Sequence, residues 1–119
     1  MHYDFLIIGG GIAGTTAAET IRARLPDATI AIIGNEVHRL YSRVLLPHVV
    51  REEVVEEKVF LRTEDFYQKK NISYLSGMTV REIDNGRHIV CVDSEQISYG
   101  KVLIATGGTP RLLSCPGGD

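Results

Sequence analysis

The hydrophobic pattern of the chain changes character within its first 25 residues. Residues 5–8 form an unbroken apolar run, too short for a helix to bury alone and rich in β-branched side chains, which predicts a buried strand. After three consecutive glycines, apolar residues recur at helical spacing between residues 12 and 25, which predicts a helix. The chain is therefore expected to begin with a strand, a glycine turn and a helix.

A second apolar run, at residues 28–34, follows a turn marked by Pro26 and Asp27. This run is expected to be a second, parallel strand, completing a β-α-β unit whose crossover should be right-handed. Further along, the pattern predicts a short helix at 44–50, a helix at 64–70 with Thr63 as its N-cap, and a strand at 72–76.

Beyond Gly77 the chain alternates apolar and polar side chains. The alternating segments 78–84 and 87–93 are joined by Asn85-Gly86, a pair typical of hairpin turns, and a third segment follows at 96–100. A last buried strand is expected at 101–108, ending in glycines at the same edge of the sheet as the first glycine turn. These patterns predict an α/β fold, a Rossmann-like parallel sheet with a β-α-β start and a β-meander crossover.

The first turn carries candidate chemistry. Gly9, Gly11 and Gly14 match the G-x-G-x-x-G pattern in the strand, turn and helix context that the pattern requires. The first glycine permits a sharp bend, the second lets backbone N–H groups approach a pyrophosphate, and the third lets the helix lie close to the strand. The anion would lie at the positive end of the helix that begins near Ile12. A dinucleotide site is the favoured interpretation, and a purely structural turn is the alternative.

Length and composition restrict the function further. The chain has 119 residues, of which 44% are hydrophobic and 24% charged, which suits one compact domain. A net charge of −2 without a long basic run argues against a nucleic-acid partner. The longest apolar stretch is about half a membrane span. This stretch is too short to predict a membrane segment. Because Asp4 stands where a signal peptide carries positive charge, we expect no secretion signal and a cytoplasmic location.

The cysteines and histidines predict no metal or redox centre. Cys91 and Cys115 form no C-x-x-C pair, and a disulfide between them is disfavoured in a cytoplasmic protein. Cys91 lies two residues after Ile89 in an alternating segment, so the two side chains share one face of the expected strand. This position predicts a buried and inert thiol. The four histidines show no ligand spacing, so no metal site is expected.

An acidic residue commonly binds the ribose hydroxyls at the end of the second strand of a nucleotide-binding fold. Here Gly34 follows Ile33 directly, and the first acid is Glu36. Either Glu36 reaches the ribose from further along the chain, or the backbone and Asn35 bind it. A solvated loop glutamate remains the alternative.

Four motifs in a fixed order cover essentially the whole chain: DFLIIGGGIAG at 4–14, LYSRVLLP at 40–47, GMTVREID at 77–84 and VLIATGGTPR at 102–111. Together they resemble the FAD-dependent pyridine nucleotide-disulfide oxidoreductases, in particular the branch of NAD(P)H-dependent ferredoxin, rubredoxin and nitrite reductases. The resemblance implies FAD as cofactor and NAD(P)H as co-substrate. It also implies a redox partner protein or a small molecule as electron acceptor.

The resemblance also implies a role for each site residue. The FAD pyrophosphate would be held by the glycine turn and the first helical turn, that is by Gly9, Gly11, Ile12, Ala13 and Gly14. Asn35 and Glu36 would face the adenosine ribose, Arg43 the pyrophosphate or flavin, and the Val80 backbone the adenine. The end of the site would be formed by Ala105, Thr106, Gly107 and Arg111. Arg43 could instead be a surface arginine and Val80 an ordinary strand residue, and a lysine typical of the family is replaced by Pro47-His48.

Several features of the family are missing from this chain. It has neither the redox cysteine pair after the second strand nor the single redox cysteine, whose position is Val44. The flavin is therefore expected to pass electrons directly to an external acceptor, and no catalytic side chain is assigned. There is no second G-x-G-x-x-G, and residues 115–119 resemble the junction to a following domain.

We therefore expect residues 1–119 to be the N-terminal part of an FAD-binding domain, without the nicotinamide-binding and C-terminal domains. Such a segment would be inactive alone, and an uncovered sheet edge would favour self-association. The alternative is a non-catalytic dinucleotide-binding module. A small NAD(P)-dependent dehydrogenase is disfavoured, because the chain lacks a Tyr-x-x-x-Lys element.

Overall fold

The computed structural model describes residues 1–109, 111 and 114–116. In this part of the chain a six-stranded sheet has the order β3-β2-β1-β6-β5-β4. Its elements are β1 (His2–Ile8), α1 (Ile12–Arg24), β2 (Ile30–Gly34), the 3-10 helix η1 (Arg43–Leu45), α2 (Leu46–Val50), the 3-10 helix η2 (Glu56–Val59), α3 (Phe66–Lys69), β3 (Ser73–Ser76), β4 (Val80–Asp84), β5 (Ile89–Val92) and β6 (Glu95–Ile104).

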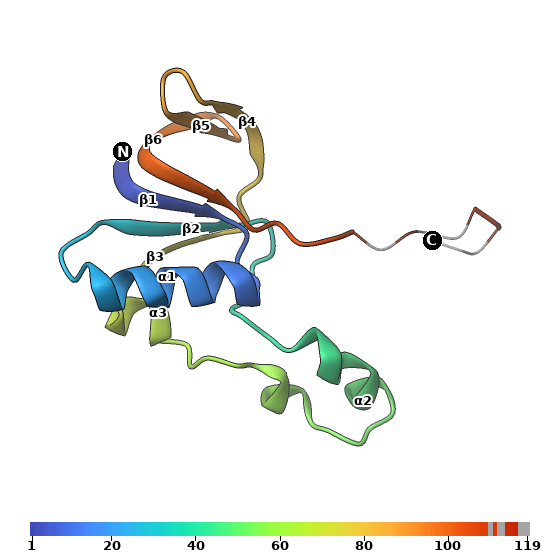
Figure 1. The fold of residues 1–119 in the computed structure, drawn as a ribbon. Helices are drawn as coiled ribbons and strands as arrows, with labels where there is room; N and C mark the ends of the chain where they lie inside the picture. Colours follow the sequence, from blue (N-terminus) through green and yellow to red (C-terminus); the bar gives the residue numbers. More distant parts are fainter. Residues whose placement is uncertain (110, 112–113, 117–119) are drawn as a thin grey trace.

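The sheet has a parallel part and an antiparallel part. Strand β1 lies between β2 and β6 and runs parallel to both, and β2 runs parallel to β3. Strands β4 and β5 form an antiparallel hairpin that continues antiparallel into β6. Figure 1 shows α1 and α3 on one side of the parallel strands and the β4–β5 hairpin on the other. The predicted α/β fold with a β-α-β start and a β-meander is confirmed.

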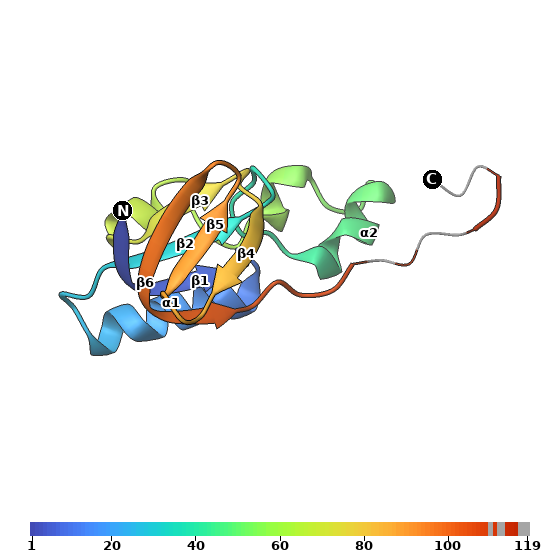
Figure 2. The same cartoon turned by 90° about the horizontal axis from the view of Figure 1, so that it is seen from above.

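Each face of the parallel strands has its own core. Leu6 and Ile8 of β1 point to the face over which β5 and β6 curl (Figure 2), where they pack with Val90 and Ile97. Ile7, between them, points to the opposite face, which α1 and α3 cover. Successive strand residues face opposite sides of a sheet, so an unbroken apolar run is what a strand buried on both faces requires.

The last strand differs from its prediction. Segments 96–100 and 101–108 are expected to be separate strands, the second of them buried. Instead β6 runs without a break from Glu95 to Ile104, and Leu103 and Ile104 at its end are exposed. Its first part pairs with β5, and from Ser98 onward it pairs with β1. A Cβ on Gly100 would lie 2.8 Å from the Asp4 carbonyl oxygen. Gly100 therefore permits close approach of two strands and does not end one.

The hairpin loop and the Cys91 thiol also differ from their predictions. Asp84 pairs with Ile89, so the loop contains four residues rather than Asn85-Gly86 alone. The Asp84 carboxylate accepts hydrogen bonds from the Arg87 backbone N–H (2.9 Å) and Nε (2.6 Å), which stabilises the longer loop. The prediction of a buried Cys91 is wrong: Cys91 is half-buried, whereas its neighbour Val90 is fully buried, because β5 turns the opposite set of side chains inward.

Between β2 and β3 the chain leaves the sheet and forms an arm, residues 42–59, that carries α2 (Figure 1). The arm is closed at its base, where the Ser42 N–H donates to the Val59 carbonyl (2.7 Å) and the Leu61 N–H donates to the Leu40 carbonyl (3.0 Å). The predicted helix at 44–50 is confirmed as η1 followed by α2.

The predicted helix at 64–70 is shorter than expected and begins at Phe66. Thr63 is not its N-cap, because the Thr63 hydroxyl donates to the Asp65 carboxylate (2.7 Å) instead of accepting from the helix. Among the described residues, no helix combines the length and apolar character needed to cross a bilayer. In the same part of the chain, no cluster of three or more His, Cys, Asp or Glu side chains is placed to hold a metal ion. Cys91 and Cys115 are both free.

Candidate functional site

The carboxyl ends of β1, β2 and β6 meet at a cavity of about 690 Å³. The strand order changes direction at β1, because β2 follows on one side and β6 on the other. Such a position is where open α/β sheets bind ligands, outside the carboxyl ends of parallel strands. Within the described part of the chain, the cavity is lined by residues 8–13, 33–36, 38–44, 61, 74, 78–80 and 105–109.

Gly9 makes the turn out of β1 between two neighbouring strand ends. Its N–H donates to the Ile33 carbonyl of β2 (2.8 Å), and the Ala105 N–H donates to the Ile8 carbonyl (2.7 Å). Gly9 has a φ of 120°, and a Cβ there would run into the Ala105 carbonyl. Only glycine adopts this conformation readily, so the first glycine of the motif makes the sharp turn that its position predicts.

Gly11 and Gly14 differ from each other in their surroundings. A Cβ on Gly14 would collide with the Gly9 carbonyl and lie 3.1 Å from Ile7 Cγ2, so Gly14 brings the helix close to the turn. Gly14 is buried beneath the cavity and does not line it. A Cβ on Gly11 would meet nothing within 4 Å. Gly11 therefore leaves space at the cavity wall, as a site for a closely approaching ligand requires.

Helix α1 begins at Ile12, directly behind this space. Gly11 occupies the N-cap position and has no side chain that could accept a hydrogen bond from the first helical turn. The N–H groups of that turn have no acceptor within the helix. Ile12 and Ala13 line the cavity. Their backbone donors and the positive end of the helix dipole are suited to an anion.

Glu36 and Arg43 lie at the same cavity and form an ion pair, with Arg43 Nη2 2.9 Å from Glu36 Oε1. The Glu36 carboxylate near the Tyr41 hydroxyl raises the pKa of Tyr41, and burial raises it further. An arginine has five N–H donors, so a single ion pair leaves donors for a phosphate. The carboxylate is an acceptor for hydroxyl groups such as those of a ribose.

The remaining predicted residues are distributed unevenly around the cavity. Asn35 lines it beside Glu36, and Val80 lines it from the beginning of β4. Ala105, Thr106 and Gly107 line it beyond β6. Arg111 is exposed and lies outside this lining, so its contact with a cofactor stays a prediction.

Sequence reasoning did not select several other lining residues, among them the aromatic or charged side chains of His38, Arg39, Tyr41 and Tyr74. Arg39 has partners of its own, because its Nε donates to the Arg62 carbonyl (3.0 Å) and its guanidinium lies 4.0 Å from the centre of the Phe60 ring. Tyr41 belongs to a quoted motif and could have been chosen on that ground. Tyr74 carries no local signal, because it is one apolar residue of an ordinary strand.

The cavity is suited to binding an anionic ligand that carries hydroxyl groups. It offers backbone donors, the Arg43 guanidinium and the Glu36 carboxylate. No cysteine is among the described lining residues. Space at Gly11 and donors at the start of α1 fit a pyrophosphate, and a carboxylate after β2 fits a ribose. The residues present therefore fit a dinucleotide.

Comparison with known proteins supports this interpretation. The sequence profile of a family described as "Pyridine nucleotide-disulphide oxidoreductase" matches residues 3–119. A ferredoxin–NAD(+) reductase subunit of the benzene 1,2-dioxygenase system from Pseudomonas putida is 36% identical over 112 residues, covering 93% of this chain and 27% of the relative. The assimilatory nitrate reductase electron transfer subunit of Bacillus subtilis is 34% identical over 116 residues, covering 96% of this chain and 15% of the relative.

The fold is shared with a solved structure as well. Putidaredoxin reductase, crystallised as a covalent complex with putidaredoxin, superposes with a TM-score of 0.86 at 30% identity, over 94% of this chain and 27% of that chain. The chain thus spans 27% or less of the length of these three proteins. The reductases of this family depend on FAD and NAD(P)H. From the matched profile, the glycine turn and the shared fold we conclude that the chain belongs to the pyridine nucleotide-disulphide oxidoreductase family.

Proposed function

We propose that the chain forms the FAD-binding part of a flavin-dependent NAD(P)H oxidoreductase that passes electrons from nicotinamide through FAD to a redox acceptor. The observation that carries this proposal is the space at Gly11 in front of the first turn of α1. When bound, FAD would supply the redox chemistry, accepting a hydride and releasing electrons. The protein would bind and orient the cofactor.

Each part of the cavity would then have a defined role. The backbone N–H groups of Ile12 and Ala13, with the Arg43 guanidinium, would hold the pyrophosphate. Asn35 and Glu36 would accept and orient the adenosine ribose, and the Val80 backbone would lie at the adenine. The Glu36–Arg43 ion pair supports this arrangement, because it keeps the two charged groups within 2.9 Å of one another.

The electron acceptor would lie outside this chain. No cysteine lines the described cavity, so no thiol is placed to receive electrons from the flavin. The matched relatives are named as a ferredoxin–NAD(+) reductase subunit and an electron transfer subunit. By analogy we propose a redox protein as the acceptor, with a small molecule as the second candidate.

The nicotinamide would bind in another part of the intact protein. The described residues contain one glycine turn at a helix N-terminus of this kind, and hydride transfer requires a nicotinamide and a flavin held together at close range. As part of the same proposal, residues 1–119 form the N-terminal part of the FAD-binding domain, and the protein is located in the cytoplasm.

The test is a titration of the purified protein with FAD, followed by the shift in flavin absorbance and the quenching of flavin fluorescence. Saturable binding is expected, with ADP competing for the adenosine half of the site. Absence of saturable FAD binding by the intact protein would overturn the proposal. Addition of NADH without oxygen then separates the alternatives: an intact reductase bleaches the bound flavin, whereas a non-catalytic module leaves it oxidised.

A further inference from the structure

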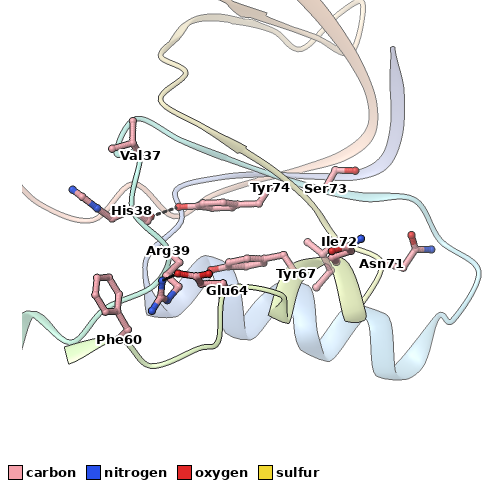
Figure 3. Close-up of a pocket in the computed structure, with 11 residues that line it drawn as sticks. Val37, His38, Arg39, Phe60, Glu64, Tyr67, Asn71, Ile72, Ser73 and Tyr74 are labelled. Carbon is pink, nitrogen blue, oxygen red and sulfur yellow. Dashed lines mark hydrogen bonds and ion pairs between the residues drawn. The ribbon is translucent and has the colours of Figure 1, made fainter. Parts of the chain in front are cut away.

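The loop after β2 carries Asn35 and Glu36, and three hydrogen bonds hold it against β3 and the turn that follows β3. The Gly34 carbonyl accepts from the Met78 N–H (3.0 Å) and the Glu36 carbonyl from the Gly77 N–H (3.2 Å). The His38 carbonyl accepts from the Tyr74 hydroxyl (3.1 Å), as Figure 3 shows. Every second carbonyl from Gly34 to His38 is therefore held by a hydrogen bond.

These three anchors are not equivalent. Two of the donors are backbone N–H groups, which almost any sequence would supply. The third is the Tyr74 side chain. Among the twenty side chains, phenylalanine has nearly the same shape without the hydroxyl, so the anchor at His38 depends on one oxygen atom.

The same hydroxyl fills space beside two glycines. A Cβ on Gly34 would lie 3.0 Å from Tyr74 Oη, while the nearest ring atom, Cζ, would be at 3.5 Å. A Cβ on Gly10 would meet the same hydroxyl even more closely. Tyr74 thus occupies the space between the glycine turn after β1 and the end of β2. A side chain at position 34 would therefore require Tyr74 or the end of β2 to shift.

The Tyr74 ring is itself held by contacts that lead to the glycine turn. It stacks on the Tyr67 ring, with centroids 4.4 Å apart and an interplanar angle of 7° (Figure 3). The Tyr67 hydroxyl lies 3.2 Å from Thr15 Oγ1. The Thr15 hydroxyl in turn donates to the Gly10 carbonyl (3.4 Å). Burial raises the pKa of Tyr74 to about 12, so its hydroxyl remains a donor at neutral pH.

We propose that Tyr74 is a positioning residue for the adenosine end of the cofactor site. Its hydroxyl anchors the loop to β3 at the His38 carbonyl and lies between Gly34 and Gly10, which sets the place of Asn35 and Glu36 relative to the first turn of α1. The inference rests on the proposed function, because it concerns the same site. It assigns a role to a residue that carries no nucleotide-binding motif.

The first experiment compares Tyr74→Phe with the matched control Tyr99→Phe in the intact protein. The Tyr99 hydroxyl lies 3.4 Å from Asn85 Oδ1 in the hairpin, away from the cavity lining. Calorimetric titration with ADP and with FAD should show affinity reduced roughly 3- to 10-fold in Tyr74→Phe, the range for loss of one neutral hydrogen bond. The control should bind both ligands like the wild type. ADP affinity unchanged in Tyr74→Phe would overturn the inference.

A second measurement needs no ligand. The N–H groups of Gly77 and Met78 donate to the Glu36 and Gly34 carbonyls, so their amide hydrogen exchange should be faster in Tyr74→Phe than in the wild type, while exchange in β1 and β6 stays the same. Unchanged exchange at Gly77 and Met78 would contradict the positioning role even if binding fell. Conversely, a wild-type protein that binds neither FAD nor ADP would defeat the proposed function, and the exchange data would still decide whether Tyr74 holds the loop.

A third measurement uses the contact with Gly34. In the wild type, Gly34→Ala places a methyl group 3.0 Å from Tyr74 Oη and should weaken ADP binding. In the Tyr74→Phe background the nearest atom would be Cζ at 3.5 Å, an ordinary contact, so the further loss should be clearly smaller. Such non-additivity is the signature of direct contact between two residues. If the fold-losses in ADP affinity of the two single variants simply multiply in the double variant, the hydroxyl does not constrain Gly34.

Discussion

The Arg43 guanidinium and the Glu36 carboxylate lie 2.9 Å apart at the cavity, joining the base of the arm to the loop after β2. Both side chains are accessible to solvent, with 62% of Arg43 and 41% of Glu36 exposed. Exposed ion pairs contribute little to stability, about 0–1 kcal/mol. Loss of either partner should therefore affect ligand binding more than folding.

Replacement of Arg43 by alanine should weaken FAD binding by about 1–3 kcal/mol, as expected for a charge-assisted hydrogen bond to a phosphate. The loss should be larger at low ionic strength, where charges are screened less. FAD titrations at two salt concentrations measure both effects. Arg81→Ala is the control, because Arg81 is similarly exposed (68%) and pairs with Asp93 on the hairpin. Equal FAD affinity in Arg43→Ala and the control at low salt would show that Arg43 is a surface arginine that does not bind the cofactor.

Gly11→Val should abolish FAD binding while preserving the fold. The branched side chain would project into the open space at the cavity wall, where nothing in the protein lies within 4 Å. The far-UV circular dichroism spectrum should be unchanged, and the FAD titration should show no saturable binding. Gly86→Val, in the hairpin loop, is the matched control. An affinity within about twofold of the wild type, or ~0.4 kcal/mol, would contradict the assignment of this turn.

Gly9→Ala should destabilise the protein itself. The substitution places a Cβ against the Ala105 carbonyl at a φ of 120°, where side chains are strained. We expect a loss of about 1–3 kcal/mol in the free energy of unfolding, measured by urea denaturation. Gly86→Ala, whose Cβ would be in ordinary contact at 3.5 Å with Asp84 Oδ1, should leave stability nearly unchanged. Equal denaturation midpoints for the two variants would show that the turn can relax.

Asp4 should make part of the stability dependent on pH. Its carboxylate accepts hydrogen bonds from the Thr29 backbone N–H (2.7 Å) and hydroxyl (2.8 Å), and these bonds lower the pKa of Asp4 below its ordinary value of 3.8. A lowered folded-state pKa means that the contribution is fully present above the unfolded-state pKa and is lost as the pH falls through the folded-state pKa.

Asp4→Asn should therefore lower the urea midpoint at neutral pH, and the difference from the wild type should shrink in strong acid, below pH 3.8. A midpoint difference for Asp4→Asn that stays constant across this range would contradict the lowered pKa of Asp4.

The outer edge of β6 should promote self-association of residues 1–119. Among the described strands, none pairs with this edge beyond Ser98, and Leu103 and Ile104 are 41% and 62% exposed. An open edge with exposed apolar side chains is a template for pairing with another chain. Light scattering should report a mass above that of the monomer, and Ile104→Lys should reduce it. A monodisperse monomer at high concentration would contradict this expectation.

Local patterns were sufficient to predict the first third of the fold. The run at 5–8, the glycines at 9, 11 and 14 and the helical spacing beyond them specify β1, the turn and α1, and α1 begins at Ile12 as expected. These signals are local because strand, turn and helix each depend on neighbouring residues. The place of the candidate site follows from them, since parallel strands carry their carboxyl ends to one edge.

The sequence by itself therefore determined the class of fold and the glycine turn, and it pointed to Glu36 and Arg43 as charged residues of the site. Only the tertiary structure decided which side of β5 faces the core, that Gly100 accommodates Asp4, and that Glu36 pairs with Arg43. It alone placed the Tyr74 hydroxyl between Gly10 and Gly34. Each of these contacts joins residues from different elements. Their geometry depends on how strands and loops distant in the sequence pack together, and no period or spacing along the chain encodes it.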